Sequence, residues 1–395
     1  MTEQITREGL ELLRREDIRR AVEENIERDP VAVALDRHVP SAAEVAGQVK
    51  RLQRARKKLP SFYAARCIMP PLAYEQSSGE MCALRKEMEG REALDLTCGL
   101  GVDAWALAGR FGHVVTVERD EVLAEVAREN FRRLGIGNIE VVCDSAEHYL
   151  RTCGRRFDWC FADPDRRGAD GRKRVLAEDC SPDMTALLPV VLGGVAPKSC
   201  IKLSPMFDVD EAFRVFGGFG RCSVEVVSSG DECKEVLVYI DADREPSLRA
   251  VAVGKGEFGV DAAALEGGVG DVERACFDPD RWRWLIVPDV ALQKSRLVRR
   301  YFGGSAFVAG ENGFAFMSER PGEGLLGRAF EIESIARYDA RSLRRELKGR
   351  RAEIMLRDTR LAAARILRDT GMREGGEVRM AVTDIGGEIW AIRLK

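Results

Sequence analysis

The sequence predicts an α/β fold in which helices cover both faces of a mainly parallel sheet. Between residues 93 and 241, short runs of β-branched residues alternate with amphipathic stretches, and this alternation is typical of a sheet covered on both faces. Before it, apolar residues such as Leu10 and Ile18 recur near the 3.6-residue period, so residues 1–70 are expected to form a helical cap. After Glu245 the regular alternation weakens, which indicates C-terminal α+β domains.

Length and composition restrict the class of protein. The chain has 395 residues, which at about 100 to 200 residues per domain indicates two to four domains. With 45% hydrophobic and 32% charged residues, disordered and fibrous chains are excluded. We expect no membrane segment, because no apolar run is long enough. The 11 cysteines include no C-x-x-C pair, and the whole sequence has only 3 histidines. We therefore expect reduced cysteines, no metal site and a cytoplasmic protein.

Changes in pattern divide the chain into four regions. The predicted boundaries are 1–70 for the helical segment, 71–245 for the α/β domain, and 246–324 and 325–395 for two α+β domains. The last region is expected to hold a long basic helical stretch followed by two β-like runs. The strands predicted in the α/β domain are Ala93–Leu96, His113–Glu118, Ile139–Cys143, Trp159–Ala162, Ser199–Leu203, Ser223–Val227 and Glu235–Ile240.

The segment from Ala93 to Asp103 joins a buried strand to a helix through a glycine-containing turn. Gly99 and Gly101 let backbone amides approach a ligand because no Cβ stands in the way, and the following helix presents its N-terminal dipole there. A tight strand-to-helix turn also needs glycine for steric reasons alone, so both readings stay open at this point.

Acidic residues follow the next three strands, at the sheet edge where open α/β folds collect ligands. The second strand ends at Glu118, whose carboxylate can accept hydrogen bonds from both hydroxyls of a nucleoside ribose. Asp144-Ser145 follows the third strand, where an adenine could be read, and Asp163-Pro164 follows the fourth. These positions indicate a nucleoside site with reactive groups beside it.

Together these motifs resemble the class I S-adenosylmethionine-dependent methyltransferases, with D-L-x-C-G-x-G at residues 95–101, an acid after strand two, D-S after strand three and D-P-x-R after strand four. The resemblance implies a Rossmann-like seven-stranded sheet with an antiparallel last strand, and S-adenosyl-L-methionine as cofactor. Further segments are similar to a bacterial family with a ferredoxin-like insert, here 246–324, and a THUMP-like domain, here 325–395. Those segments are Pro288–Lys294, Arg357–Thr359 and Gly375-Gly376, while Glu75–Glu80 resembles the segment that class I methyltransferases close over the methionine end of the cofactor.

The resemblance also implies roles for individual residues. Asp163, Pro164 and Arg166 would be catalytic, because the carboxylate and backbone carbonyl of a D-P turn can accept both N–H bonds of an exocyclic base amine. The sequence departs from the common N/D-P-P-Y/F/W pattern, since Asp165 and Arg166 replace the second proline and the aromatic residue. The residues that would bind the cofactor are Gln76, Asp95, Cys98, Gly99, Gly101, Asp103, Glu118, Asp144 and Ser145.

Three residues near the predicted catalytic edge are candidates for substrate binding: Arg167, Lys202 and Ser204. Lys202 lies within a predicted strand, where an unpaired ammonium group is costly, so we expect it to pair with Asp163 or Asp165. The alternative is a lysine at the edge of the sheet that reaches solvent.

Basic clusters add a candidate surface for nucleic acid. Residues 341–370 hold ten basic and four acidic side chains, a local +6 in a chain of net charge −3, and Lys50–Lys58 is also strongly basic. The candidates for contacts with the phosphates of an RNA backbone, which recur at helical spacing, are Arg344, Arg345 and Lys348. A solvated helix face is the alternative reading.

The function that these features favour is methylation of a base nitrogen in RNA, either rRNA or tRNA, by S-adenosyl-L-methionine. One alternative is a methyltransferase of the same fold that acts on a small molecule. Another is a binding protein that has kept the cofactor fold without turnover.

Overall fold

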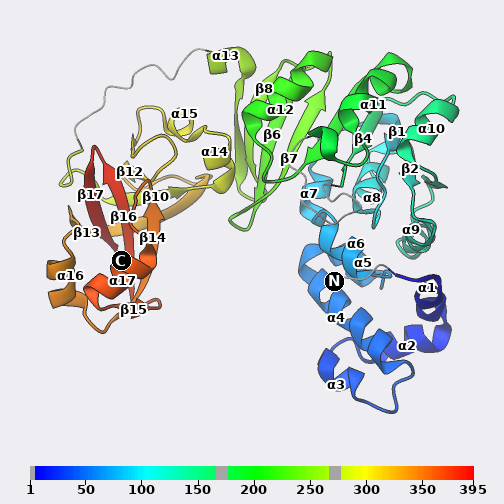
Figure 1. The fold of residues 1–395 in the computed structure, drawn as a ribbon, viewed down its shortest axis with the longest axis horizontal. Coiled ribbons are helices and arrows are strands. Elements are labelled where there is room, and N and C mark those ends of the chain that lie inside the picture. The colour runs from blue at the N-terminus through cyan, green and yellow to red at the C-terminus, as the bar shows by residue number, and fades with distance from the viewer. Residues whose placement is uncertain (1–4, 166–176, 267–276) are drawn as a thin grey trace. The chain divides into compact units, whose positions relative to one another are not determined.

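The computed structural model describes residues 5–165, 177–266 and 277–395 (Figure 1). The chain forms two compact units. The first comprises Met1–Cys222 with Leu237–Arg244, and the second comprises Ser223–Val236 with Glu245–Lys395. The predicted four-part division draws its boundaries differently and stays a prediction.

The first unit opens with short helices, as the sequence predicts. Proline occupies the first turn of three of them, where a missing N–H leaves no hydrogen bond unmade. Leu10, Leu52 and Phe62 lie fully buried in the core that the helices share. These helices are α1 (Arg7–Arg14), α2 (Glu16–Glu24), α3 (Pro30–Ala34), α4 (Ala42–Lys58), α5 (Pro60–Ala64), α6 (Pro71–Gln76) and α7 (Glu80–Leu84).

A sheet with the strand order β3-β2-β1-β4-β5-β7 follows in the same unit (Figure 1). The pairs β1–β2, β2–β3, β1–β4 and β4–β5 are parallel, so the carboxyl ends of these strands meet at one edge. The strands are β1 (Gly90–Asp95), β2 (Phe111–Glu118), β3 (Ile139–Cys143), β4 (Trp159–Ala162), β5 (Lys198–Leu203) and β7 (Glu232–Ile240). The helical segments between them are α8 (Val102–Ala108), α9 (Glu121–Arg133), α10 (Ala146–Thr152), η1 (Ala177–Asp179), α11 (Met184–Val190), η2 (Val191–Val195), α12 (Val209–Phe216) and η3 (Gly217–Phe219).

Strand β7 continues into the second unit, where the order is β7-β6-β8-β9. The strands added here are β6 (Cys222–Ser229), β8 (Ser247–Ala252) and β9 (Gly256–Asp261). Gly230 and Asp231 connect β6 to β7 with φ of 60° and 66°, a two-residue turn that joins antiparallel strands. The seven predicted strands are all present, in the order β3-β2-β1-β4-β5-β7-β6, and within the described residues β8 and β9 extend this sheet to nine strands.

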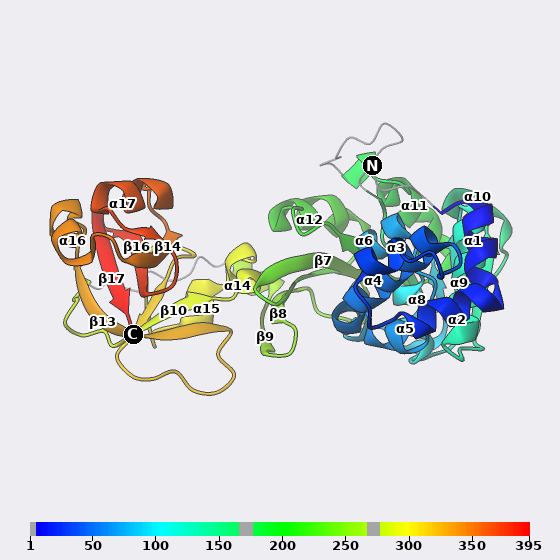
Figure 2. The same cartoon turned by 90° about the horizontal axis from the view of Figure 1, so that it is seen from below.

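The second unit also holds a sheet of its own, with the order β11-β12-β10-β13-β17-β16-β14-β15. Its strands are β10 (Trp284–Pro288), β11 (Phe307–Val308), β12 (Ala315–Met317), β13 (Gly327–Arg337), β14 (Arg351–Arg357), β15 (Arg373–Glu374), β16 (Val378–Ile385) and β17 (Glu388–Leu394). The helices of the second unit are α13 (Ala262–Glu266), α14 (Val290–Lys294), α15 (Val298–Phe302), α16 (Ala340–Leu347) and α17 (Ala363–Thr370). Figure 2 shows α16 and α17 on one face of this sheet, where Leu343 and Ile366 pack against Met380 and Val382 of β16.

The prediction of a long basic helix in the last region is wrong. Helix α16 ends at Leu347, and Gly349 follows with φ of 85°, a backbone conformation that interrupts a helix. The chain then forms β14 before α17 begins at Ala363. Seven of the ten basic residues of 341–370 thus lie in α16, β14 and α17, and Lys348, Arg350 and Arg360 lie between these elements.

Two sequence predictions can be compared with the described part of the chain. None of its helices is both long and apolar enough to cross a membrane. Its ten cysteines are all free, and burial raises the pKa of Cys160 and of several others.

Candidate active site

The turn between β1 and α8 has the backbone that its glycines allow. Gly99 and Gly101 have φ of 55° and 87°, and the N–H of Gly101 donates to the Cys98 carbonyl at 2.8 Å. A Cβ on Gly101 would lie 2.6 Å from the Phe131 ring, so only glycine fits there. The Cys98 side chain is buried, and its N–H donates to Val117 O on β2 at 2.9 Å. By contrast, no atom lies within 4 Å of the position that a Cβ on Gly99 would take, so the turn has open space at this point.

Asp95 at the end of β1 is fully buried and hydrogen-bonded. Its carboxylate accepts from Thr116 Oγ1 at 2.7 Å and from the Thr97 N–H at 2.9 Å. Burial raises the pKa of Asp95 to about 7, although these hydrogen bonds favour the anion. Asp95 therefore fixes the start of the turn.

Glu118 at the end of β2 lies beside the same turn. One carboxylate oxygen accepts from the Gly99 N–H at 2.8 Å, and the other accepts from the Asp120 N–H at 3.0 Å. Burial raises the pKa of Glu118, and the two backbone donors oppose that rise. Since each carboxylate oxygen can accept more than one hydrogen bond, both retain acceptor capacity for a ligand.

Asp144 follows β3 and is held by the first turn of α10. Its oxygens accept from the Ser145 N–H at 2.7 Å and lie 2.6 Å from His148 Nδ1, and the hydrogen bond with His148 lowers the pKa of Asp144. Ser145 caps α10, because its Oγ accepts from the His148 N–H at 3.1 Å. His148 thus orients a candidate ligand group.

Asp103 in the first turn of α8 anchors the segment that precedes β1. Its carboxylate lies 2.6 Å from Lys86 Nζ and accepts from Ser78 Oγ at 2.7 Å. Burial opposes ionisation of Asp103, but the charges of Lys86 and Lys202 and the hydrogen bonds from Lys86 and Ser78 together outweigh it and lower the pKa. Ser78 and Lys86 flank helix α7, so this buried ion pair fixes the segment, while Gln76, two residues before Ser78, is exposed.

The carboxyl end of β4 carries the group predicted to be catalytic. The Asp163 carboxylate pairs with Lys202 Nζ of β5, which confirms the pairing expected from the sequence. The Asp163 N–H donates to Thr97 Oγ1 at 2.7 Å, and Thr97 Oγ1 lies 3.3 Å from Asp95 Oδ1. Burial raises the pKa of Asp163, while the ammonium of Lys202 holds that rise back. The strand ends of β1, β4 and β5 are therefore linked by one chain of polar contacts.

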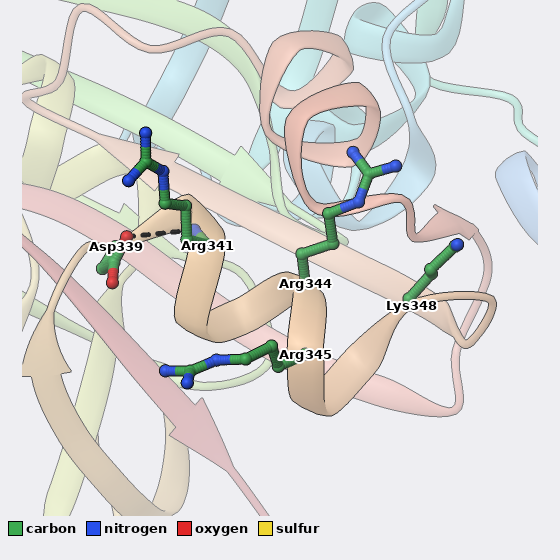
Figure 3. Close-up of a pocket in the computed structure, with 5 residues that line it drawn as sticks. All are labelled: Asp339, Arg341, Arg344, Arg345 and Lys348. Atoms are coloured by element: carbon green, nitrogen blue, oxygen red, sulfur yellow. Dashed lines mark hydrogen bonds between the residues drawn. The ribbon is translucent and has the colours of Figure 1, made fainter.

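A second cluster lies on α16 of the second unit. Asp339, Arg341, Arg344, Arg345 and Lys348 line an open hollow, and all four cations are exposed. Figure 3 shows Arg344 and Lys348 extending to one side of the helix and Arg345 to the other. Asp339 caps the helix by accepting from the Arg341 N–H at 3.0 Å. Arg345 and Lys348 form no ion pair with any described residue, so their charges face solvent.

Two family models match parts of this chain. Residues 93–178 match a family described as a methyltransferase domain, and residues 327–395 match a family described as THUMP domain-like. The chain carries a methyltransferase domain. S-adenosyl-L-methionine is the methyl donor of this class, so the enzyme is an S-adenosylmethionine-dependent methyltransferase.

Relatives agree with this assignment. An uncharacterized S-adenosylmethionine-dependent methyltransferase of Mycobacterium tuberculosis is 26% identical over 308 residues, which cover 76% of this chain and 79% of that protein. The 23S rRNA (uracil(1939)-C(5))-methyltransferase RlmD of Xylella fastidiosa is 46% identical over 83 residues, or 20% of this chain and 19% of that protein. A putative methyltransferase from Porphyromonas gingivalis has the same fold, with a TM-score of 0.75 at 24% identity over 100% of this chain and 99% of that chain.

The methyltransferase domain has groups that fit the cofactor. Open space at Gly99 lies beside the Glu118 carboxylate, which keeps acceptor capacity on both oxygens. The Asp144 carboxylate at the end of the neighbouring strand offers a further acceptor. Hydroxyl and amino groups of a nucleoside need acceptors of this kind. Among the described residues no three His, Cys, Asp or Glu side chains gather as a metal site would require.

The sequence motifs locate some residues of the candidate site and miss others. The motifs locate Asp95, Glu118 and Asp163, which the structure brings to one sheet edge, but not Thr97 and Lys86. Thr97 occupies the first variable position of the D-L-x-C-G-x-G motif at residues 95–101, so a hydroxyl at a strand end is the available signal. Ser204, also predicted, accepts from the Met206 N–H at 3.0 Å just after β5, and Pro164 is buried. Two predicted residues, Arg166 and Arg167, lie outside the described residues.

Proposed function

We propose that this enzyme methylates a nitrogen of a base in RNA, with Asp163 as the group that accepts hydrogen bonds from the target amine. The observation that carries the proposal is the Asp163–Lys202 pair at the end of β4. Lys202 engages one oxygen of the carboxylate, and Thr97 fixes the backbone of the same residue. Asp163 is thus a fixed acceptor that keeps an oxygen for a substrate.

The remaining site residues would hold the cofactor. Glu118 would accept the ribose hydroxyls, and Asp144 with Ser145 would read the adenine. The turn from Cys98 to Gly101 would lie against the methionine end, with Asp95 fixing the turn. Gln76 and Asp103 would help to position the segment that closes over the methionine end, since Asp103 already accepts a hydrogen bond from Ser78 in that segment.

The chemistry requires positioning more than a strong base. When bound, S-adenosyl-L-methionine supplies an electrophilic methyl group on a sulfonium. An exocyclic base amine is a poor nucleophile, because its lone pair is conjugated with the ring. Asp163 and the Pro164 carbonyl would accept its two N–H bonds and favour the pyramidal nitrogen. The lone pair then forms the C–N bond as the C–S pair returns to sulfur, and the nitrogen loses one proton to water.

RNA is the substrate class that the second unit favours. Its THUMP-like segment includes α16, whose exposed cations suit a phosphate backbone. Several relatives of the methyltransferase domain are named as RNA methyltransferases, which supports the same substrate. Arg166 and Arg167, which follow Pro164, would add contacts to the base or its phosphate. An enzyme that acts on RNA would work in the cytoplasm.

The test combines methyl transfer with RNA binding. Purified enzyme should transfer labelled methyl groups from S-adenosyl-L-methionine to unmodified RNA. Replacing Arg344, Arg345 and Lys348 with Gln should reduce the salt slope of RNA binding by about 0.7 to 0.9 for each phosphate that is no longer neutralised. A matched variant changes three cations of the same unit that are engaged by glutamates: Arg337, Arg379 and Lys395. If RNA accepts no methyl group but a small molecule does, the substrate class is wrong.

A further inference from the structure

Helix α4 presents a row of cations along one face. Arg51, Arg54 and Lys58 are spaced by three and four residues, so their side chains lie on the same side of the helix. Arg56 lies on the opposite side, where it pairs with Glu27 and stacks on the Tyr63 ring at 4.9 Å. Arg56 is therefore neutralised by an acid, whereas Arg51 and Arg54 form no ion pair among the described residues.

Arg51 is the most unusual member of this row. Its Nε is buried without a hydrogen-bond partner, and the side chain forms no ion pair in the described part of the chain. The guanidinium folds back over Gly47, where an added Cβ would lie 3.2 Å from Nη1. Burial lowers the pKa of Arg51 to about 10, so the group is still charged at neutral pH. A half-buried cation without an anion costs free energy that a bound anion would recover.

The other members of the row surround Tyr74. Arg54 Cζ and Lys58 Nζ lie 5.8 Å and 4.9 Å from the centre of its ring. Lys58 Nζ also donates to the Tyr74 carbonyl at 2.7 Å. Arg54 forms no ion pair among the described residues, so its charge is available to a ligand.

Through Tyr74, this row contacts a segment of the chain that continues to the candidate active site. Tyr74 belongs to α6, and Ser78 follows two residues after that helix ends at Gln76. Ser78 donates to Asp103 in the first turn of α8. A ligand lying on Arg51, Arg54 and Lys58 would therefore lie against the same segment that reaches the cofactor turn.

We propose that Arg51 and Arg54 bind backbone phosphates of the RNA substrate, with Lys58 and Tyr74 holding this face in place. The planar, five-donor guanidinium suits phosphate oxygens better than a point charge does. The proposal rests on the proposed function, because the choice of RNA as the anion comes from there.

The experiment compares the R51Q/R54Q double variant with R56Q, which makes the same change on the opposite face of α4. Binding of a labelled single-stranded RNA is measured over a salt series, and S-adenosyl-L-methionine binding is measured by calorimetry. For R51Q/R54Q we expect a salt slope lower by about 1.4, because two phosphates are no longer neutralised, with cofactor affinity unchanged. For R56Q the slope should match the parent. Because Arg51 has no ion-pair partner among the described residues, R51Q/R54Q should melt no lower than R56Q.

Each other result overturns the inference. A slope equal to that of R56Q would show that Arg51 and Arg54 bind no phosphate. Loss of cofactor affinity with an unchanged RNA slope would identify the cofactor's carboxylate as the anion. A melting temperature well below that of R56Q would make the row structural. If the parent enzyme itself binds RNA without salt dependence, the proposed function is wrong. This outcome is distinguishable from failure of the present inference, because it is seen with the parent enzyme before any variant is compared.

Discussion

Replacing Lys202 with Met removes the cation that Asp163 faces while keeping a side chain of similar length. The Lys202 and Asp163 side chains are 11% and 30% exposed. Removing one partner of a fully buried pair costs about 3–5 kcal/mol, and partial exposure of Asp163 reduces this to about 2 kcal/mol. At 1.36 kcal/mol per factor of ten, this weakens ionisation of Asp163 about thirtyfold.

The consequence is a displaced pH profile. Burial raises the pKa of Asp163 and Lys202 holds that rise back, so removing Lys202 moves the pKa higher still. If the ionised carboxylate is the acceptor, methyl transfer by K202M should fall about thirtyfold on the acid side of the profile and recover as pH rises. The assay is transfer of labelled methyl groups to RNA across a pH series, at saturating cofactor.

Lys198→Met is the matched control. Lys198 lies on the same strand, four residues away or about 13 Å along it, and pairs with Asp241 at 3.1 Å and Asp243 at 2.7 Å. K198M should leave the pH profile unchanged. An acid limb in K202M that coincides with that of K198M would refute the role of the Lys202–Asp163 pair.

Three other variants test the cofactor turn. E118Q should weaken S-adenosyl-L-methionine binding by about 1.5–3 kcal/mol in calorimetry, and unchanged affinity would exclude Glu118 from the site. G101A should lower the free energy of unfolding in urea by about 2–4 kcal/mol, because φ is 87° and the new Cβ meets Phe131; an unchanged midpoint would contradict this. The pKa of Asp95 is raised from 3.8 to about 7, so the parent should lose stability as pH rises between these values. D95N should lack this loss. Urea unfolding at several pH values measures the pH dependence of the free energy of unfolding, and a dependence in D95N equal to that of the parent would contradict this prediction.

The strand ends were predictable because their signals are local. β3 and β4 begin and end where their apolar runs do, and acids after parallel strands must share one sheet edge. The pairing of Lys202 followed from the cost of an unpaired ammonium group within a strand. These inferences needed no knowledge of distant contacts.

Other features depend on packing that a linear pattern does not reveal. Lys86 resembles a solvated lysine in sequence, and its burial follows from the contact of its segment with Asp103 in α8. The region after Ala340 was predicted as one helix because its frequent arginines conceal the apolar spacing. Only Gly349 marked the interruption, and a single glycine is a weak signal against a helical pattern.

We propose that this methyltransferase modifies an RNA base through Asp163. Mass spectrometry of nucleosides from the RNA of a deletion strain, complemented with the parent gene or with D163A, tests it most directly. We expect one methylated nucleoside that disappears on deletion, returns with the parent and stays absent with D163A. A nucleoside profile unchanged by deletion, or fully restored by D163A, would contradict it.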